Sequence, residues 1–383
     1  MRHQSHQVHR RPQLEALTGL RFVAAAQVVL FHAFVSRLGD VPPIIRGVIG
    51  AGYSGVSLFF VISGFVLTYN YLSVEVRGCS KVRNFWAARV ARVYPVYLVG
   101  IGVAGAFSVL SRTQGLGGPS SGGSPHEHVT VLLSQVTLTQ AWFPRLACRL
   151  NCPGWSLSVE ALFYLAFPLL AILLYARSTR GLVGVMTICW AASVATSMMY
   201  LHVDPDGLGT TSPLQAATWL DVVKFNPLLH LPEFITGMAA GLLFLRRSPT
   251  LSGWAATLSF LAALSILGSL MMSERVPYLL FHNGLLSPLY AWLVCLLAVG
   301  EGPLVGILRA SPMILLGEAS YALYVLHRPL WSWWHMGRSA SGVDAVSVWS
   351  LVPYILTAIL LSVITLKVVE QPARKVLRSR LEA

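Results

Sequence analysis

The 383-residue sequence predicts an all-α, polytopic membrane helix bundle, and three observations carry this prediction. Apolar residues make up 55% of the chain and charged residues only 11%. The mean hydropathy is +0.64. Apolar runs of about 20 residues, the length needed to cross a bilayer, recur between short polar links.

We expect about ten transmembrane helices in a single membrane domain. The expected spans are 17–36, 48–72, 93–111, 158–176, 181–201, 226–245, 253–272, 280–299, 311–336 and 347–366. Residues 1–16 would form a cytoplasmic N-terminal arm, residues 17–370 the membrane domain, and residues 371–383 a basic cytoplasmic tail. No small-residue cleavage site follows the first apolar run, so that run is expected to remain as an anchor.

The distribution of basic residues favours cytoplasmic termini. With the N-terminus inside, 18 of the 28 Lys and Arg residues fall in cytoplasmic segments and eight in outer links. The positive-inside rule then predicts that both termini are cytoplasmic, in a multi-pass protein of the cell inner membrane. Because this topology accounts for the net charge of +13, we expect the lipid bilayer as partner and no nucleic acid.

Residues 112–157 are expected to form one long outer excursion. Within it, residues 129–142 are short and polar for a span, and they are more typical of a re-entrant or interfacial segment. A crossing there would invert every later loop against the charge rule. Cys148 and Cys152 lie in this excursion, where oxidation is feasible, so a local disulfide is one hypothesis. The sequence has no zinc-type spacing, and we expect no metal.

The first apolar segment contains the strongest clue to function, an arginine and a histidine. Arg21 and His32 are eleven residues apart, which puts them on one helix face about 16 Å apart along the axis. Ionisable residues inside a membrane are costly and usually face a cavity or the bundle interior. An arginine that snorkels from the helix end, with a hydrogen-bonded core histidine, is the equally open structural alternative.

A second cluster precedes the third apolar segment. Arg89 and Arg92 are spaced to share one helix face, and Tyr94 follows them. Guanidinium groups suit phosphates, so this cluster indicates a cytoplasmic site for a phosphate-rich carrier. An ordinary positive-inside anchor explains the same residues.

A third group, Trp155, Ser156 and Glu160, lies at the outer mouth of the fourth span. Ser156 is one turn before Glu160, so we expect a hydrogen bond between them. Glu160 would then orient an acceptor sugar or a catalytic histidine. Helix capping and interface anchoring are equally open roles for this group.

The fourth group, Ser320, Tyr324 and His327, falls on one helical face at spacings of four and three. The tyrosine is also suited to packing, and a buried histidine to structural hydrogen bonding. Glu233 is a further intramembrane acid, for which the sequence identifies no partner.

In this order and register, these four motifs resemble the acyltransferase 3 family of integral-membrane acyltransferases over nearly the whole chain. The second helix, from Gly55 to Phe65, is also similar. The chain departs from the family pattern at Ala161, where members often carry a second acid, and at Arg328, where an aromatic residue is common.

The resemblance implies transfer of an acyl group, usually acetyl, from cytoplasmic acyl-coenzyme A to a hydroxyl of a carbohydrate or glycosylated product. His32 would be the essential histidine, Arg21 its partner, and Arg89 with Arg92 the donor-binding pair, with Tyr94 beside them. Acyl-CoA is then a co-substrate, and no permanently bound cofactor is expected. A histidine with an ordinary pKa near 6.5 suits a general base, and it can also accept the acyl group and relay it.

The acceptor is open between two classes. The resemblance extends to macrolide 3-O-acyltransferases and to polysaccharide O-acetyltransferases, and we lean slightly toward a secondary-metabolite hydroxyl. A transporter or flippase for a glycosylated lipid or metabolite is the rival from another class, and dependence on the donor separates the two. A catalytically silent scaffold of the same fold would give His32 no role.

Overall fold

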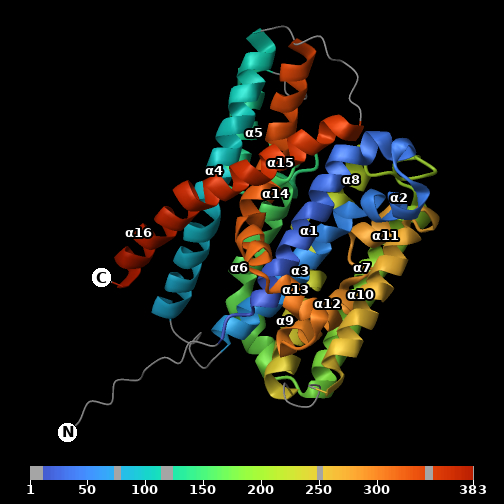
Figure 1. Ribbon diagram of the computed structural model, residues 1–383, viewed down its shortest axis with the longest axis vertical. Helices are drawn as coiled ribbons and strands as arrows, with labels where there is room; N and C mark the ends of the chain where they lie inside the picture. Colours follow the sequence, from blue (N-terminus) through green and yellow to red (C-terminus); the bar gives the residue numbers. More distant parts are fainter. Residues whose placement is uncertain (1–11, 73–78, 114–123, 248–252, 341–347, 383) are drawn as a thin grey trace.

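The computed structural model describes residues 12–72, 79–113, 124–247, 253–340 and 348–382. These residues contain sixteen α-helices and no strand, and the helices pack into one bundle (Figure 1). The expected N-terminal arm, up to residue 11, and the glycine-rich run at 114–123 lie outside the described residues. The prediction of an all-α helix bundle is confirmed.

The bundle is built from long spanning helices and shorter connecting ones. The α-helices are α1 (Glu15–Phe34), α2 (Pro43–Gly50), α3 (Gly55–Tyr71), α4 (Cys79–Thr113), α5 (Pro125–Val136), α6 (Gly154–Tyr175), α7 (Thr179–Val203), α8 (Thr218–Phe225), α9 (Pro227–Arg247), α10 (Ala255–Met271), α11 (Tyr278–His282), α12 (Ser287–Val299), α13 (Pro303–Leu308), α14 (Ser311–Ala340), α15 (Val348–Thr365) and α16 (Gln371–Glu382). Short 3-10 turns lie at Val35–Asp40, Gly52–Ser54, Gln140–Trp142 and Ser273–Arg275, and a π-helical turn lies at Leu366–Glu370.

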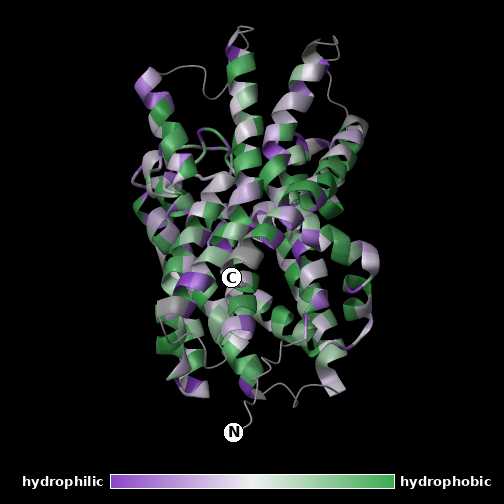
Figure 2. Ribbon diagram, turned by 90° about the vertical axis from the view of Figure 1, so that its left-hand side faces the viewer, coloured by the Kyte–Doolittle hydropathy of each residue, from purple (hydrophilic) through white to green (hydrophobic). Residues whose placement is uncertain are grey.

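Every expected span falls on a helix, but fewer helices qualify as membrane-crossing by length and composition. Eight of the described helical segments are long and apolar enough. Of the remaining two expected spans, α10 has only 17 residues, and α14 is long enough but less apolar. Hydrophobic residues nevertheless predominate along the helices (Figure 2), as the composition requires of a polytopic membrane protein.

Two segments differ from their expected extents. The third span begins well before residue 93, because α4 is a continuous helix of 35 residues. Arg89 and Arg92 therefore lie on the spanning helix itself rather than in a preceding loop. In the outer excursion, α5 has only 12 residues and is not among the candidate spans, which agrees with a non-crossing segment there.

Glycines let the central helices approach closely. On α3, a Cβ at Gly64 would lie 2.2 Å from the Phe234 carbonyl oxygen of α9; reciprocally, one at Gly237 would lie 2.1 Å from the Val61 oxygen. Small residues at such crossings allow backbone-to-backbone contact between membrane helices. The backbones of α3 and α9 are therefore in direct contact.

Glu233 on α9, predicted without a partner, has two. The Ser57 hydroxyl of α3 donates to its Oε1 at 2.5 Å, and its Oε2 lies 3.1 Å from His230 Nδ1. The side chain is only 1% exposed. Gly284, at φ +86°, brings the turn after α11 against this carboxyl group. The acid therefore joins α3 to α9 instead of facing a cavity.

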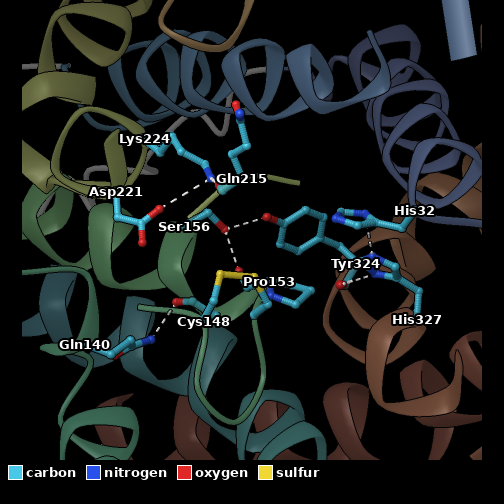
Figure 3. Close-up of a disulfide and its surroundings, with 12 residues drawn as sticks. His32, Gln140, Cys148, Pro153, Ser156, Gln215, Asp221, Lys224, Tyr324 and His327 are labelled. Carbon is cyan, nitrogen blue, oxygen red and sulfur yellow. Dashed lines mark hydrogen bonds and ion pairs between the residues drawn. A yellow bond between two sulfur atoms is a disulfide. The ribbon is translucent and has the colours of Figure 1, made fainter. Parts of the chain in front are cut away.

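A disulfide and hydrogen bonds hold the outer excursion in place. The predicted Cys148–Cys152 disulfide is present, next to Pro153 and Ser156 at the start of α6 (Figure 3). The Tyr97 hydroxyl of α4 donates to the Gln135 carbonyl at 3.0 Å. Gln140 Nε2 donates both to the Tyr97 hydroxyl at 3.1 Å and to the Gly154 carbonyl at 2.7 Å, and so joins α4 to the beginning of α6.

The predicted basic tail is a helix that returns to the bundle. α15, the π turn and α16 form one continuous run that crosses α14 and α4 (Figure 1). α16 packs on α4, so the tail contributes to the structure around the charged residues of α4.

Candidate active site

A cavity of about 430 Å³ lies among α1, α3, α4, α6, α14 and α16. This volume is within the usual range for small-molecule sites. Its polar lining comes from separate parts of the sequence: Thr18, Arg21, Ser63, Asn70, Arg89, Arg92, Ser156, Glu160, Tyr164, Glu318, Tyr321, Tyr324 and Arg374.

Three arginines of the cavity lack an acidic partner. Within the described part of the chain, neither Arg21 of α1 nor Arg89 and Arg92 of α4 forms a salt bridge. Arg89 donates to the Tyr71 hydroxyl at 2.9 Å and lies over the Tyr71 and Phe85 rings, while its Nε is buried with no partner. Guanidinium groups that form no salt bridge inside a membrane protein are suited to binding an anion.

Glu160 lies with these arginines. It accepts a hydrogen bond from the Tyr164 hydroxyl at 2.9 Å and is close enough to Arg21, Arg92 and Arg89 to interact with them electrostatically. The expected hydrogen bond from Ser156 to Glu160 is not formed. The structure thus brings this acid to the cationic part of the cavity and not against His32.

Ser156 and Tyr324 both line the cavity. Their hydroxyl oxygens are 2.8 Å apart, and the Ser156 hydroxyl also lies 3.0 Å from the Pro153 carbonyl. Figure 3 shows the Tyr324 ring between Ser156 on one side and two histidines on the other.

Those two histidines are His32 of α1 and His327 of α14. His327 Nε2 is 3.1 Å from His32 Nδ1, and His327 Nδ1 is 2.7 Å from the Tyr324 carbonyl oxygen. A carbonyl only accepts, so His327 carries its proton on Nδ1 and presents Nε2 as an acceptor. His32 then carries its proton on Nδ1, which also faces the Val28 carbonyl at 3.0 Å.

This hydrogen-bond chain determines which nitrogen of His32 has a free lone pair. With the proton on Nδ1, the lone pair is on Nε2, for which no partner exists among the described residues. His327 is fully buried, whereas His32 is only half-buried. A half-buried histidine with a free lone pair and a buried orienting partner has the geometry of a general base or nucleophile.

Arg21 and His32 lie on one helix as expected, but they serve different surroundings. Arg21 lines the cavity, whereas His32 is beyond the Tyr324 side chain and contacts His327. The pair predicted from spacing is therefore divided between the arginine-lined cavity and a histidine pair.

Besides His32 and His327, three predicted residues do not line the cavity. The Tyr94 hydroxyl donates to the Val136 carbonyl of α5 at 3.1 Å. Trp155 is buried and stacks on His282 with ring centroids 5.6 Å apart. The Ser320 hydroxyl donates to the Gly317 carbonyl within its own helix at 2.7 Å.

Sequence reasoning missed Arg374, Glu318 and Tyr164. Arg374 was expected in a passive tail, although its spacing of four from Glu370 is typical of a helical ion pair, and the structure contains that pair. Glu318 and Tyr164 adjoin recognised motifs. Among the described residues, no group of three or more metal-ligating side chains is arranged to hold a metal ion.

The apolar helix bundle is that of a multi-pass membrane protein, and it contains an arginine-lined cavity next to a histidine pair. The acyltransferase 3 family model, described as an acyltransferase domain, matches residues 14–367. The chain therefore belongs to the acyltransferase 3 family.

Several curated proteins are similar to the chain. Acyltransferase MdmB of Streptomyces mycarofaciens is 29% identical over 82% of this chain and 78% of its own length. Peptidoglycan O-acetyltransferase OatA of Listeria monocytogenes is 22% identical over 95% of this chain, which spans only 56% of OatA. Putative O-acetyltransferase SACOL0978 of Staphylococcus aureus is 24% identical over 49% of this chain and 30% of its own length. No solved structure matches. Family and relatives together support an O-acyltransferase.

Proposed function

We propose that this protein is a membrane O-acyltransferase that moves an acyl group, usually acetyl, from acyl-CoA to a hydroxyl. The acceptor is a secondary metabolite such as a macrolide, or a cell-surface carbohydrate. One observation carries the proposal. Arg21, Arg89 and Arg92 line a cavity and form no salt bridge with any described residue, and Tyr324, which lines the same cavity, lies beside the His32–His327 pair.

The residues that line the cavity predict how acyl-CoA is oriented when it binds. The diphosphate and ribose phosphate of acyl-CoA would bind at the arginines, because guanidinium groups form charge-assisted hydrogen bonds with phosphates. The thioester would then reach toward Ser156 and Tyr324. Since acyl-CoA is cytoplasmic, the arginine end of the cavity faces the cytoplasm, which agrees with cytoplasmic termini and with a location in the inner membrane.

In the chemical step, His32 Nε2 accepts the proton of the acceptor hydroxyl while that oxygen attacks the thioester carbonyl. The new C–O bond forms, the C–S bond breaks, and the coenzyme A thiolate leaves and takes up the proton. His327 is a positioning residue, because its Nε2 fixes the Nδ1–H tautomer of His32. General-base catalysis of this kind contributes about 10² to 10⁴ in rate. Alternatively, His32 Nε2 first accepts the acyl group and relays it to the acceptor.

The first test follows release of the coenzyme A thiol by purified protein given acetyl-CoA and a panel of macrolides and surface glycans. Acceptor-dependent release supports the proposal. His32→Ala should abolish release and leave acetyl-CoA binding intact. His126→Ala, an exposed histidine in α5, is the matched control and should behave as the native protein. Release unchanged by His32→Ala would contradict the assigned role.

The role of His327 has its own test. His327→Gln retains a side-chain acceptor for His32, whereas His327→Ala removes it. We expect kcat to fall in the alanine variant with KM for the donor unchanged, and partial recovery in the glutamine variant. Trapping acylated His32 in a single turnover would support the relay, and product without that adduct would support direct transfer.

The competing transporter function makes the opposite prediction about the donor. A transporter of glycosylated lipids has no need to bind acyl-CoA at Arg89 and Arg92. Transport of a labelled glycolipid without donor binding would therefore replace the proposal.

A further inference from the structure

The C-terminal helix supplies a fourth guanidinium to the cavity. Arg374, on α16, lines the same cavity as Arg21, Arg89 and Arg92. Arg374 is close enough to Arg92 and to Arg89 to be repelled electrostatically by each of them. Its helix packs on α4, the helix that carries those two arginines.

Arg374 is held in place by a buried acid. One of its terminal nitrogens donates to Glu370 Oε1, one turn earlier in the chain. Glu370 is completely buried at the π turn between α15 and α16. Among the described residues, both Arg374 Nε and Glu370 Oε2 are buried without a hydrogen-bond partner. The pair therefore retains unused donor capacity at the cavity wall.

Four guanidinium groups from α1, α4 and α16 line one cavity, and like charges at short range repel each other. Arg374 is paired with Glu370, and Glu15, Glu160 and Glu318 also line the cavity. Among the described residues, however, no carboxylate forms an ion pair with Arg21, Arg89 or Arg92. A ligand with several negative charges relieves the repulsion and uses the free donors. Because the guanidinium groups come from three helices, a ligand with separate phosphates offers more of them a partner than a single phosphate does.

We infer that Arg374 is a donor-binding residue and that α16 forms the wall of the cavity against the phosphates of acyl-CoA. This inference rests on the proposed function. It assigns a binding role to a segment that the sequence presents as a basic tail, and it couples the position of α16 to the presence of the donor.

The test measures acetyl-CoA binding to the full-length, detergent-purified protein by calorimetry. Arg374→Gln should raise the Kd by about tenfold or more, as expected for loss of a charge-assisted hydrogen bond, and Arg374→Lys by less. Lys375→Gln removes the same charge from the next, exposed position of α16, and it should change the Kd by less than about twofold, as expected for a screened surface charge. 3′-Dephospho-acetyl-CoA identifies the phosphate, because the effect of Arg374→Gln disappears with this ligand if Arg374 binds the ribose phosphate.

Hydrogen exchange provides a readout that a merely structural role would not change. Acetyl-CoA should slow amide exchange in residues 371–376 of the native protein and of Lys375→Gln, but not of Arg374→Gln. Equal affinities for Arg374→Gln and Lys375→Gln, with native binding intact, would overturn the inference and leave the proposed function standing. Absence of binding by the native protein would overturn both.

Discussion

Glu233→Ala tests whether the buried acid of α9 is structural. The side chain is 1% exposed, accepts from Ser57 at 2.5 Å and lies 3.1 Å from His230. Its removal leaves His230 Nδ1 unpaired, while Ser57 retains only the His282 carbonyl at 3.2 Å. Leaving a buried hydrogen-bonding group without its partner costs about 1 to 3 kcal/mol.

The assay is thermal unfolding in detergent, followed by loss of the monodisperse peak on size-exclusion chromatography. Glu233→Ala should lower the apparent Tm by several degrees. Glu233→Gln should recover most of it, since the amide still accepts from Ser57 and donates to His230. The matched control Glu274→Ala removes an exposed carboxylate and should leave Tm unchanged. A native Tm for Glu233→Ala, or equal losses for the alanine and glutamine variants, would refute the reasoning.

Two further predictions concern packing and the outer excursion. Gly64→Leu should destabilise the bundle by about 1 to 3 kcal/mol or more, because a Cβ there meets the α9 backbone. The control is Gly102→Leu, because a Cβ at Gly102 has no neighbour within 4 Å. Equal melting temperatures of the two variants would contradict close α3–α9 packing. Cys148 and Cys152 should resist alkylation until the protein is reduced. Cys148→Ser should lower the free energy of unfolding by about 2 kcal/mol, by the chain-entropy relation. Alkylation of both thiols in unreduced membranes, detected by mass spectrometry, would exclude the disulfide.

The sequence was sufficient for the helices, because apolar run length alone selects spanning segments. The sequence was less informative about where the helices begin and end. The continuation of α4 back to Cys79 was missed, since the charged residues before Val93 have the composition of a loop although they are compatible with helix. Charge patterning at the inner end of a helix does not distinguish an anchor in a loop from an extension of the helix.

The candidate site was predictable only in part. Spacing along α1 correctly put Arg21 and His32 on one helix, but it could not show that Tyr324 lies between the cavity and His32. The His32–His327 contact joins residues 295 positions apart, and only tertiary packing brings them together. Arg374 was missed for the same reason, because its role depends on where α16 returns to the bundle.

Binding of acetyl-CoA to the purified protein tests the central claim most directly, since it requires no knowledge of the acceptor. The native protein should bind, and the Arg89→Ala, Arg92→Ala double variant should not, while it elutes and melts as the native protein does. Failure of the native protein to bind acetyl-CoA in lipid nanodiscs or detergent, or undiminished binding by the folded double variant, would contradict the account.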